Sequence, residues 1–364
     1  MNEAKPLTFV GDNAVRYRGR TLLHFSGCDY FRLARSPKLA AAAGAALKQN
    51  GLNVAASRRT TGNHPIYARL EGELAAFFGA PAALLLPDGY YAPLAAAQAL
   101  AGECTHAFLD ELAHGALTDA ARFLDVRIKR FRHRDANHLK SLLQRAGPLA
   151  RPLILTDGMF AHDGSVAPLR DYLKLLPANG WLLVDDAHGA GLLGANGRGT
   201  LEAAGVGRRQ IIQCATLSKA FGAYGGVVLG SRRLRENLLS HSRIFNGTTP
   251  LPPPLAGAGL AAVRILRQGK TRRRRLFTKV DQVRKHLREA GWEITDTPGP
   301  IIRLPPQTEA GVKRLKAKLL AAGIYPPFLK YSGASPGGAF RFVISSEHRQ
   351  DQLDRLIAVL GGVD

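Results

Sequence analysis

Seven short apolar runs within residues 83–229 restrict the fold of this chain more than any other feature of its sequence. The runs show no alternation of apolar and polar side chains, which indicates strands buried on both faces. Helical patterns separate them, and this order is typical of a mostly parallel sheet flanked by helices, an α/β fold. The runs are residues 83–86, 105–109, 126–131, 153–156, 181–184, 211–215 and 227–229.

The length of the chain and the segments outside these runs indicate more than one domain. A chain of 364 residues exceeds the size at which single cores stop growing, roughly 250–300 residues. We expect an N-terminal segment with a hairpin over residues 1–36, a large domain over 37–254 and a small α+β domain over 255–364. Prolines at 250 and 252–254 mark the second boundary. The small domain should contain a long helix over 255–290, helices over 310–322 and from 350, and strands over 292–295, 301–304 and 340–345.

Charge and cysteine content exclude several classes of protein. Fifty Lys and Arg against 28 Asp and Glu give a net charge of +22, which could favour an anionic partner. The basic residues are dispersed without interleaved aromatic side chains, so solvated surfaces are the simpler interpretation and nucleic-acid binding is the alternative. No apolar run is long enough to span a membrane. Three widely spaced cysteines suggest neither a disulfide framework nor a zinc site, and the start lacks a secretory signal, so we expect a cytoplasmic protein.

Three strand ends carry residues suited to catalysis. Asp185, Asp186 and His188 follow the run 181–184, and a buried carboxylate at that point needs a cationic partner. Lys219 follows the run 211–215 and has the hydroxyls of Thr216 and Ser218 nearby. A lysine held away from water can attack carbonyl groups. Together these groups suit pyridoxal phosphate, an aldehyde cofactor with a phosphate and a ring nitrogen.

The third strand end is the loop 110–115, where His114 could lie flat against a cofactor ring. Each of these residues also has a purely structural interpretation. His114 could be a satisfied loop histidine, and Asp185 with His188 could be an ion pair that closes a strand. Lys219 would then be an ordinary surface lysine.

The chain resembles the α-oxoamine synthases, a fold-type-I pyridoxal-phosphate family related to the class II aminotransferases. The resemblance covers nearly the whole length and is most specific at residues 184–194, 197–199 and 216–222. Weaker matches are residues 62–65, 157–160 with 163–164, and 248–249. The resemblance implies a seven-stranded, mostly parallel sheet, a small C-terminal domain and a homodimer with shared active sites.

The resemblance also implies roles for individual residues. Lys219 would bind the cofactor covalently and move the Cα proton of the substrate, while Asp185 would pair with the ring nitrogen. His188 would bond to the phenolic oxygen of the ring and His114 would stack on the ring. The phosphate would bind to Thr216, to the backbone at Gly89 and Tyr90, and to Thr249 of a second subunit. Arg341 would hold the substrate carboxylate, although a surface arginine on a strand is the alternative.

Several positions depart from the family pattern, and these departures lie among groups expected to face the substrates. Cys28 and Ala161 replace polar family residues, Pro93 replaces an asparagine, and the loop 53–58 lacks the family's glycines. Family members with long acyl-CoA donors usually start with an extra basic helix, whereas this chain starts close to the hairpin. We therefore expect an altered acyl pocket.

The function expected from the resemblance is decarboxylating C-acyl transfer, in which an amino acid condenses with an acyl-CoA or acyl carrier protein thioester. An aminotransferase of class I or II is the alternative with the same cofactor. A nucleic-acid-binding protein on a retired enzyme scaffold is the alternative from another class, and only the charge of +22 supports it.

Overall fold

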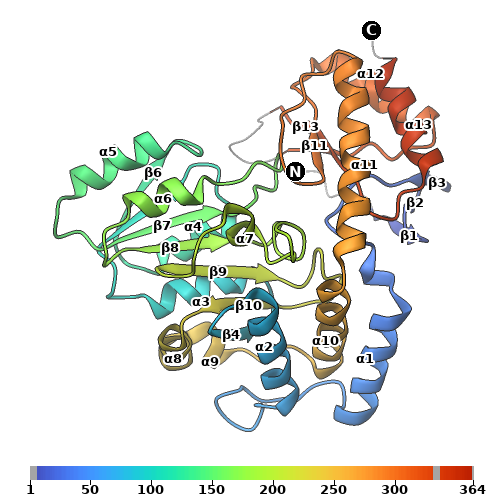
Figure 1. The fold of residues 1–364 in the computed structure, drawn as a ribbon. Helices are drawn as coiled ribbons and strands as arrows, with labels where there is room; N and C mark the ends of the chain where they lie inside the picture. The colour runs from blue at the N-terminus through green and yellow to red at the C-terminus, as the bar shows by residue number, and fades with distance from the viewer. Residues whose placement is uncertain (1–5, 331–336, 363–364) are drawn as a thin grey trace. The chain divides into compact units, whose positions relative to one another are not determined.

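A computed structural model describes residues 6–330 and 337–362 of the chain, so the first five residues of the expected N-terminal segment and the last two of the C-terminal domain lie outside the described residues (Figure 1). Two compact units are distinguished. The large unit comprises Leu33–Ala161 and Ser165–Lys270, and the small unit comprises Met1–Arg32, His162–Gly164 and Thr271–Asp364.

The large unit is built on one seven-stranded sheet, as predicted, in the order β4-β10-β9-β8-β7-β5-β6. The pairs from β9 to β6 are parallel, whereas β10 runs antiparallel to both β4 and β9. The sheet is therefore mostly parallel. Its strands are β4 (Ala82–Leu86), β5 (His106–Asp110), β6 (Arg127–Phe131), β7 (Pro152–Asp157), β8 (Trp181–Asp185), β9 (Ile211–Thr216) and β10 (Gly226–Gly230).

Helices cover both faces of this sheet (Figure 1). On β7, Leu153 and Leu155 pack with α3 (Tyr91–Ala99), α4 (Gly115–Arg122) and α8 (Arg232–His241), while Ile154 packs on the opposite face with α5 (Ala136–Ala146) and α6 (Leu169–Leu175). Successive apolar residues thus enter different cores, which is why the runs do not alternate. The other helices are α1 (Pro37–Asn50), α2 (Pro65–Phe78), α7 (Thr200–Ala204), α9 (Arg243–Gly247) and α10 (Pro253–Arg267).

The helix α2 shows how local signals set the two ends of an element. Pro65 occupies the first turn, where its missing N–H is harmless, and His64 Nδ1 accepts the N–H of Ile66 at 3.2 Å. Gly79 ends the helix in the left-handed conformation, with φ of 63°. Proline at the start and glycine at the end therefore define the bounds of α2.

The small unit contains two three-stranded sheets. The first joins β1 (Thr8–Val10), β2 (Ala14–Tyr17) and β3 (Arg20–Leu23), which includes the predicted hairpin. The second has the order β11-β13-β12, and α11 (Lys270–Glu289), α12 (Glu309–Ala321) and α13 (Gln350–Gly361) complete the unit. The strands of the second sheet are β11 (Ile301–Arg303), β12 (Phe328–Leu329) and β13 (Ala339–Val343).

Two expectations for the C-terminal part were wrong. The single helix over 255–290 is two helices, α10 and α11, because the chain turns at Gly269, whose N–H bonds to the carbonyl of Leu266 at 3.0 Å. Residues 292–295 form no strand, and the indole of Trp292 instead donates to the carbonyl of Leu360 at 2.9 Å. Among residues 6–330 and 337–362, no helix has the length and apolar character needed to cross a membrane.

Candidate functional site

The large unit has a cavity of about 220 Å³ at the carboxyl ends of β7, β8 and β9, which we call the Lys219 cavity. Parallel sheets place their strand ends on a common edge, so residues distant in sequence meet there. Most of the site residues predicted from sequence line this cavity: Gly89, Tyr90, His114, Asp185, His188, Thr216 and Lys219.

Lys219 enters the cavity from a tight turn after β9. The N–H of Gly222 bonds to the carbonyl of Lys219 at 2.9 Å, and Gly222 has a φ of 61°. A Cβ at Gly222 would lie only 2.4 Å from the backbone nitrogen of Ala34. The turn that presents Lys219 therefore requires glycine at this position.

The end of β8 supplies a buried carboxylate. Asp185 is 6% exposed and accepts the N–H of Ala187 at 3.1 Å. No lysine, arginine or histidine of the described residues forms an ion pair with it. His188, also buried, follows on the same loop and lines the same cavity. The buried carboxyl group of Asp185 thus suits a cationic partner in the cavity.

Asp186, the neighbour of Asp185, stabilises the loop rather than lining the cavity. Its carboxylate accepts the N–H of Thr200 at 2.9 Å, the hydroxyl of Thr200 at 2.9 Å and the amide of Gln213 at 2.7 Å. Burial raises the pKa of Asp186 to about 7, although these donors oppose the shift. The two adjacent aspartates therefore have different environments.

His114 has both structural and site-lining features. Its Nδ1 accepts the N–H of Ala116 at 3.2 Å and caps α4, while its ring lies edge to face with Tyr90 at a centroid distance of 6.0 Å. Its backbone N–H donates to Asp157 at 2.8 Å. The contacts with Ala116 and Tyr90 consequently fix the orientation of the His114 ring, and the residue still lines the Lys219 cavity.

Glycine allows the backbone to approach Thr216 closely at the other end of the cavity. A Cβ at Gly89 would lie 2.6 Å from the hydroxyl of Thr216, and this hydroxyl accepts the N–H of Ser218 at 3.1 Å. α3 begins at Tyr91, and Tyr90, the residue after Gly89, is its N-cap. Hydroxyls and N–H groups at a helix N-terminus form a typical binding environment for phosphate.

Two predicted site residues do not line the Lys219 cavity. Thr249 is exposed and lines a neighbouring cavity of about 730 Å³ that shares Asp88 and Tyr90 with the first. Arg341 belongs to β13 of the small unit, where it is buried and its backbone N–H bonds to the carbonyl of Pro327 at 2.9 Å. The roles expected for both remain predictions.

Sequence reasoning missed two carboxylates of the cavity, Asp157 and Asp88. Asp157 ends β7 as Asp185 ends β8, and burial, followed by repulsion from Asp185, raises the pKa of its carboxyl well above the ordinary value. The position of Asp157 at the end of an apolar run was the available signal. For Asp88, the Asp-Gly pair after the run 83–86 was the available signal.

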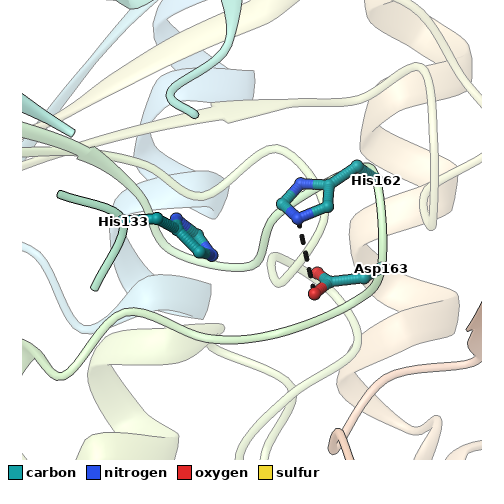
Figure 2. A group of neighbouring side chains, drawn as sticks. All are labelled: His133, His162 and Asp163. Carbon is teal, nitrogen blue, oxygen red and sulfur yellow. Dashed lines mark ion pairs between the residues drawn. The ribbon is translucent and has the colours of Figure 1, made fainter. Parts of the chain in front are cut away.

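The segment His162–Gly164 belongs to the small unit. There the imidazole Nε2 of His162 forms an ion pair with Asp163 at 3.4 Å, as Figure 2 shows. Both side chains have little exposure.

Comparison with known proteins adds a family to this geometry. Residues 22–360 match the family described as Aminotransferase class I and II. The chain is 37% identical over 345 residues to an 8-amino-7-oxononanoate synthase of Thioalkalivibrio sulfidiphilus, covering 94% of this chain and 88% of the relative.

Solved structures show the same likeness over nearly the whole chain. An 8-amino-7-oxononanoate synthase from Francisella tularensis has a TM-score of 0.80 at 26% identity, covering 93% of this chain and 97% of that chain. A serine palmitoyltransferase from S. paucimobilis with bound PLP-myriocin aldimine has a TM-score of 0.92 at 24% identity, covering 98% and 91%. The similarity to the serine palmitoyltransferase shows that the two chains share the same fold.

Proposed function

Because the chain belongs to the class I and II aminotransferase family, we propose that it is a decarboxylating C-acyltransferase that condenses a small amino acid with an acyl thioester, as an 8-amino-7-oxononanoate synthase does. The chain is a transferase that depends on pyridoxal phosphate. The observation that carries the proposal is the convergence of Lys219, Asp185, His188 and Thr216 on one cavity.

The residues of the Lys219 cavity fit this cofactor. Asp185 has a buried carboxyl group without an ion-pair partner among the described residues, which suits a protonated ring nitrogen. Gly89 and Thr216 approach closely just before α3, and N–H groups at the start of a helix suit a phosphate. Bound pyridoxal phosphate supplies an electron-withdrawing ring that stabilises negative charge on the Cα atom of an amino acid.

Each residue then has a proposed task. Lys219 binds the cofactor and transfers the proton at Cα, while Asp185 keeps the ring nitrogen protonated. His188 donates to the phenolic oxygen, and His114 covers one face of the ring. Thr216, with the backbone at Gly89 and Tyr90, binds the phosphate.

Partners and substrates follow from the same proposal. Thr249, contributed by a second copy in a homodimer, would complete the phosphate site, and Arg341 would bind the substrate carboxylate. The acyl donor would be a thioester of coenzyme A or acyl carrier protein, whose negative charge suits the +22 of the chain. Three free cysteines are consistent with a cytoplasmic location.

The name of the relatives' product suggests substrates to test first. A nine-carbon 8-amino-7-oxo acid is assembled when alanine loses carbon dioxide and joins a seven-carbon dicarboxylic acyl group. We therefore propose alanine as the amino acid and a thioester of that acyl group as the donor.

The experiment supplies purified, cofactor-loaded protein with alanine, glycine or serine, with and without acyl-CoA. Release of carbon dioxide that requires the thioester supports acyl transfer, and release of a keto acid without thioester supports an aminotransferase. Lys219→Ala should abolish the reaction, whereas Lys174→Ala, at an exposed position on α6, should leave it unchanged. A protein that takes up no pyridoxal phosphate contradicts the proposal.

A further inference from the structure

Asp88 places a negative charge at the end of the Lys219 cavity where the proposed function places the cofactor phosphate. It lies between β4 and α3 and lines the cavity beside Gly89, Tyr90 and Thr216. Its Oδ1 accepts the backbone N–H of Tyr90 at 2.7 Å. The carboxylate is therefore fixed at the first turn of α3.

Two further interactions hold Asp88 in this position. Its backbone carbonyl accepts the N–H of Tyr91 at 3.2 Å, and the hydroxyl of Tyr224 donates to its carboxylate. This hydrogen bond is the main reason why the pKa of Tyr224 is raised. Asp88 thus belongs to an ordered network that lines the Lys219 cavity.

This carboxylate competes with a bound phosphate for the N–H of Tyr90. The N–H groups and the positive end of a helix N-terminus attract anions, and Asp88 already uses the amide of Tyr90. A carboxylate beside a phosphate also repels it, and at about 5 Å in water this repulsion corresponds to roughly tenfold in affinity.

We propose that Asp88 is an internal competitor of the cofactor phosphate, so that this chain holds pyridoxal phosphate more weakly than the same cavity would with a neutral side chain. The inference rests on the proposed function, because that function supplies the phosphate. It assigns Asp88 a part in setting cofactor affinity and none in the chemical steps.

Two substitutions separate the charge of Asp88 from its hydrogen bond. Asp88→Asn removes the charge but keeps an oxygen that can accept the N–H of Tyr90. Asp88→Ser also removes the charge and keeps a hydroxyl oxygen as a shorter acceptor. It provides a second test if Asp88→Asn does not fold. Asp119→Asn is the matched control, because within residues 6–330 and 337–362 Asp119 bonds to the side-chain hydroxyl of Tyr90 and to Arg122, and not to the N–H of Tyr90.

The measurement is the dissociation constant of the apoprotein for pyridoxal phosphate and for pyridoxal, which lacks the phosphate, by equilibrium dialysis. Thermal melting of each apoprotein checks folding. We expect Asp88→Asn to bind pyridoxal phosphate about tenfold more tightly and pyridoxal with unchanged affinity. Asp119→Asn should match the wild type for both ligands.

Other outcomes overturn the inference. Unchanged affinity for pyridoxal phosphate in both Asp88 variants contradicts it while leaving the proposed function intact. Equal tightening for both ligands also contradicts it, because the effect would not depend on the phosphate. Absence of binding by the wild type and all variants contradicts this inference and the proposed function together.

Discussion

Asp157 and Asp185 are paired residues on the adjacent parallel strands β7 and β8, so two buried carboxylates end side by side in the Lys219 cavity. Burial and the charge of Asp185 raise the pKa of Asp157, while Lys219 and the N–H of His114 oppose the shift. This arrangement places two carboxyl groups where the proposed function places a cationic ring, and the raised pKa of Asp157 keeps a proton on one of them in the folded apoprotein. The stability of the apoprotein should therefore depend on pH through Asp157.

Asp157→Asn should stabilise the apoprotein at alkaline pH. The raised pKa means that the folded state keeps a proton that the unfolded chain loses near pH 4, so the stability contributed by Asp157 is lost as the pH rises. The asparagine does not ionise and can still accept the N–H of His114. We expect a gain of about 1 kcal/mol or more at pH 8 and a smaller gain at pH 5. Denaturant unfolding measures both; an equal gain at the two pH values would contradict the explanation.

Gly222→Ala should disturb the turn that presents Lys219. The added Cβ would meet the backbone of Leu33 and Ala34 at 2.4–2.5 Å, and the φ of 61° is unfavourable for alanine. We expect a loss of about 2 kcal/mol or more in the free energy of unfolding, together with weaker uptake of pyridoxal phosphate. Gly207→Ala is the control, because its Cβ would meet no atom within 4 Å. Equal free energies of unfolding for the two variants would contradict the claim that the turn requires glycine at position 222.

Ala55→Gly should stabilise the protein, although it shortens a side chain. Ala55 has a φ of 49°, in the left-handed region that costs an L-residue about 1–2 kcal/mol. The sequence lacks glycine in the loop 53–58, yet the backbone adopts a conformation that glycine favours. We expect a gain of about 0.5 kcal/mol or more in thermal or denaturant unfolding. Ala56→Gly, at negative φ, is the control and should be destabilising. A lower free energy of unfolding for Ala55→Gly would contradict the idea that the backbone at Ala55 is strained.

The small unit should lose stability in acid through His24 and His348. Burial lowers the pKa of His24 to about 4 and that of His348 to about 3. His348 Nδ1 accepts the N–H of Ser345 at 2.8 Å and its Nε2 lies 3.1 Å from the carbonyl of His24, which fixes the neutral ring. Since the unfolded chain binds these protons near pH 6.5, stability is complete above that value and falls progressively below it.

His348→Asn tests this pH dependence. The variant should be less stable than the wild type at pH 7.5, because it loses the bond to His24. It should also lose less stability between pH 6.5 and pH 4, because one buried titrating group is gone. Urea unfolding at several pH values measures how the free energy of unfolding depends on pH in the variant and in the wild type. Parallel pH profiles for variant and wild type would exclude His348 as the cause.

Much of the fold was predictable because its signals are local. The apolar runs gave seven strands, and Pro65 and Gly79 gave the bounds of α2. Prediction from local patterns failed where the same side chains are compatible with one long helix or with two shorter ones. The basic and apolar residues of 255–290 suit one long helix, and Gly269 divides it.

The sequence by itself indicated which residues at or just beyond the ends of β8 and β9 line the Lys219 cavity, because Asp185 ends one buried strand and His188 and Lys219 lie three residues beyond the ends of two. Only the tertiary structure decided which strands are neighbours, and with this the pairing of Asp157 with Asp185 and the insertion of antiparallel β10 between β4 and β9. It also decided that Asp88 bonds to the amide of Tyr90. These relationships depend on hydrogen bonding and packing between segments distant in the chain, which no local pattern of residues encodes.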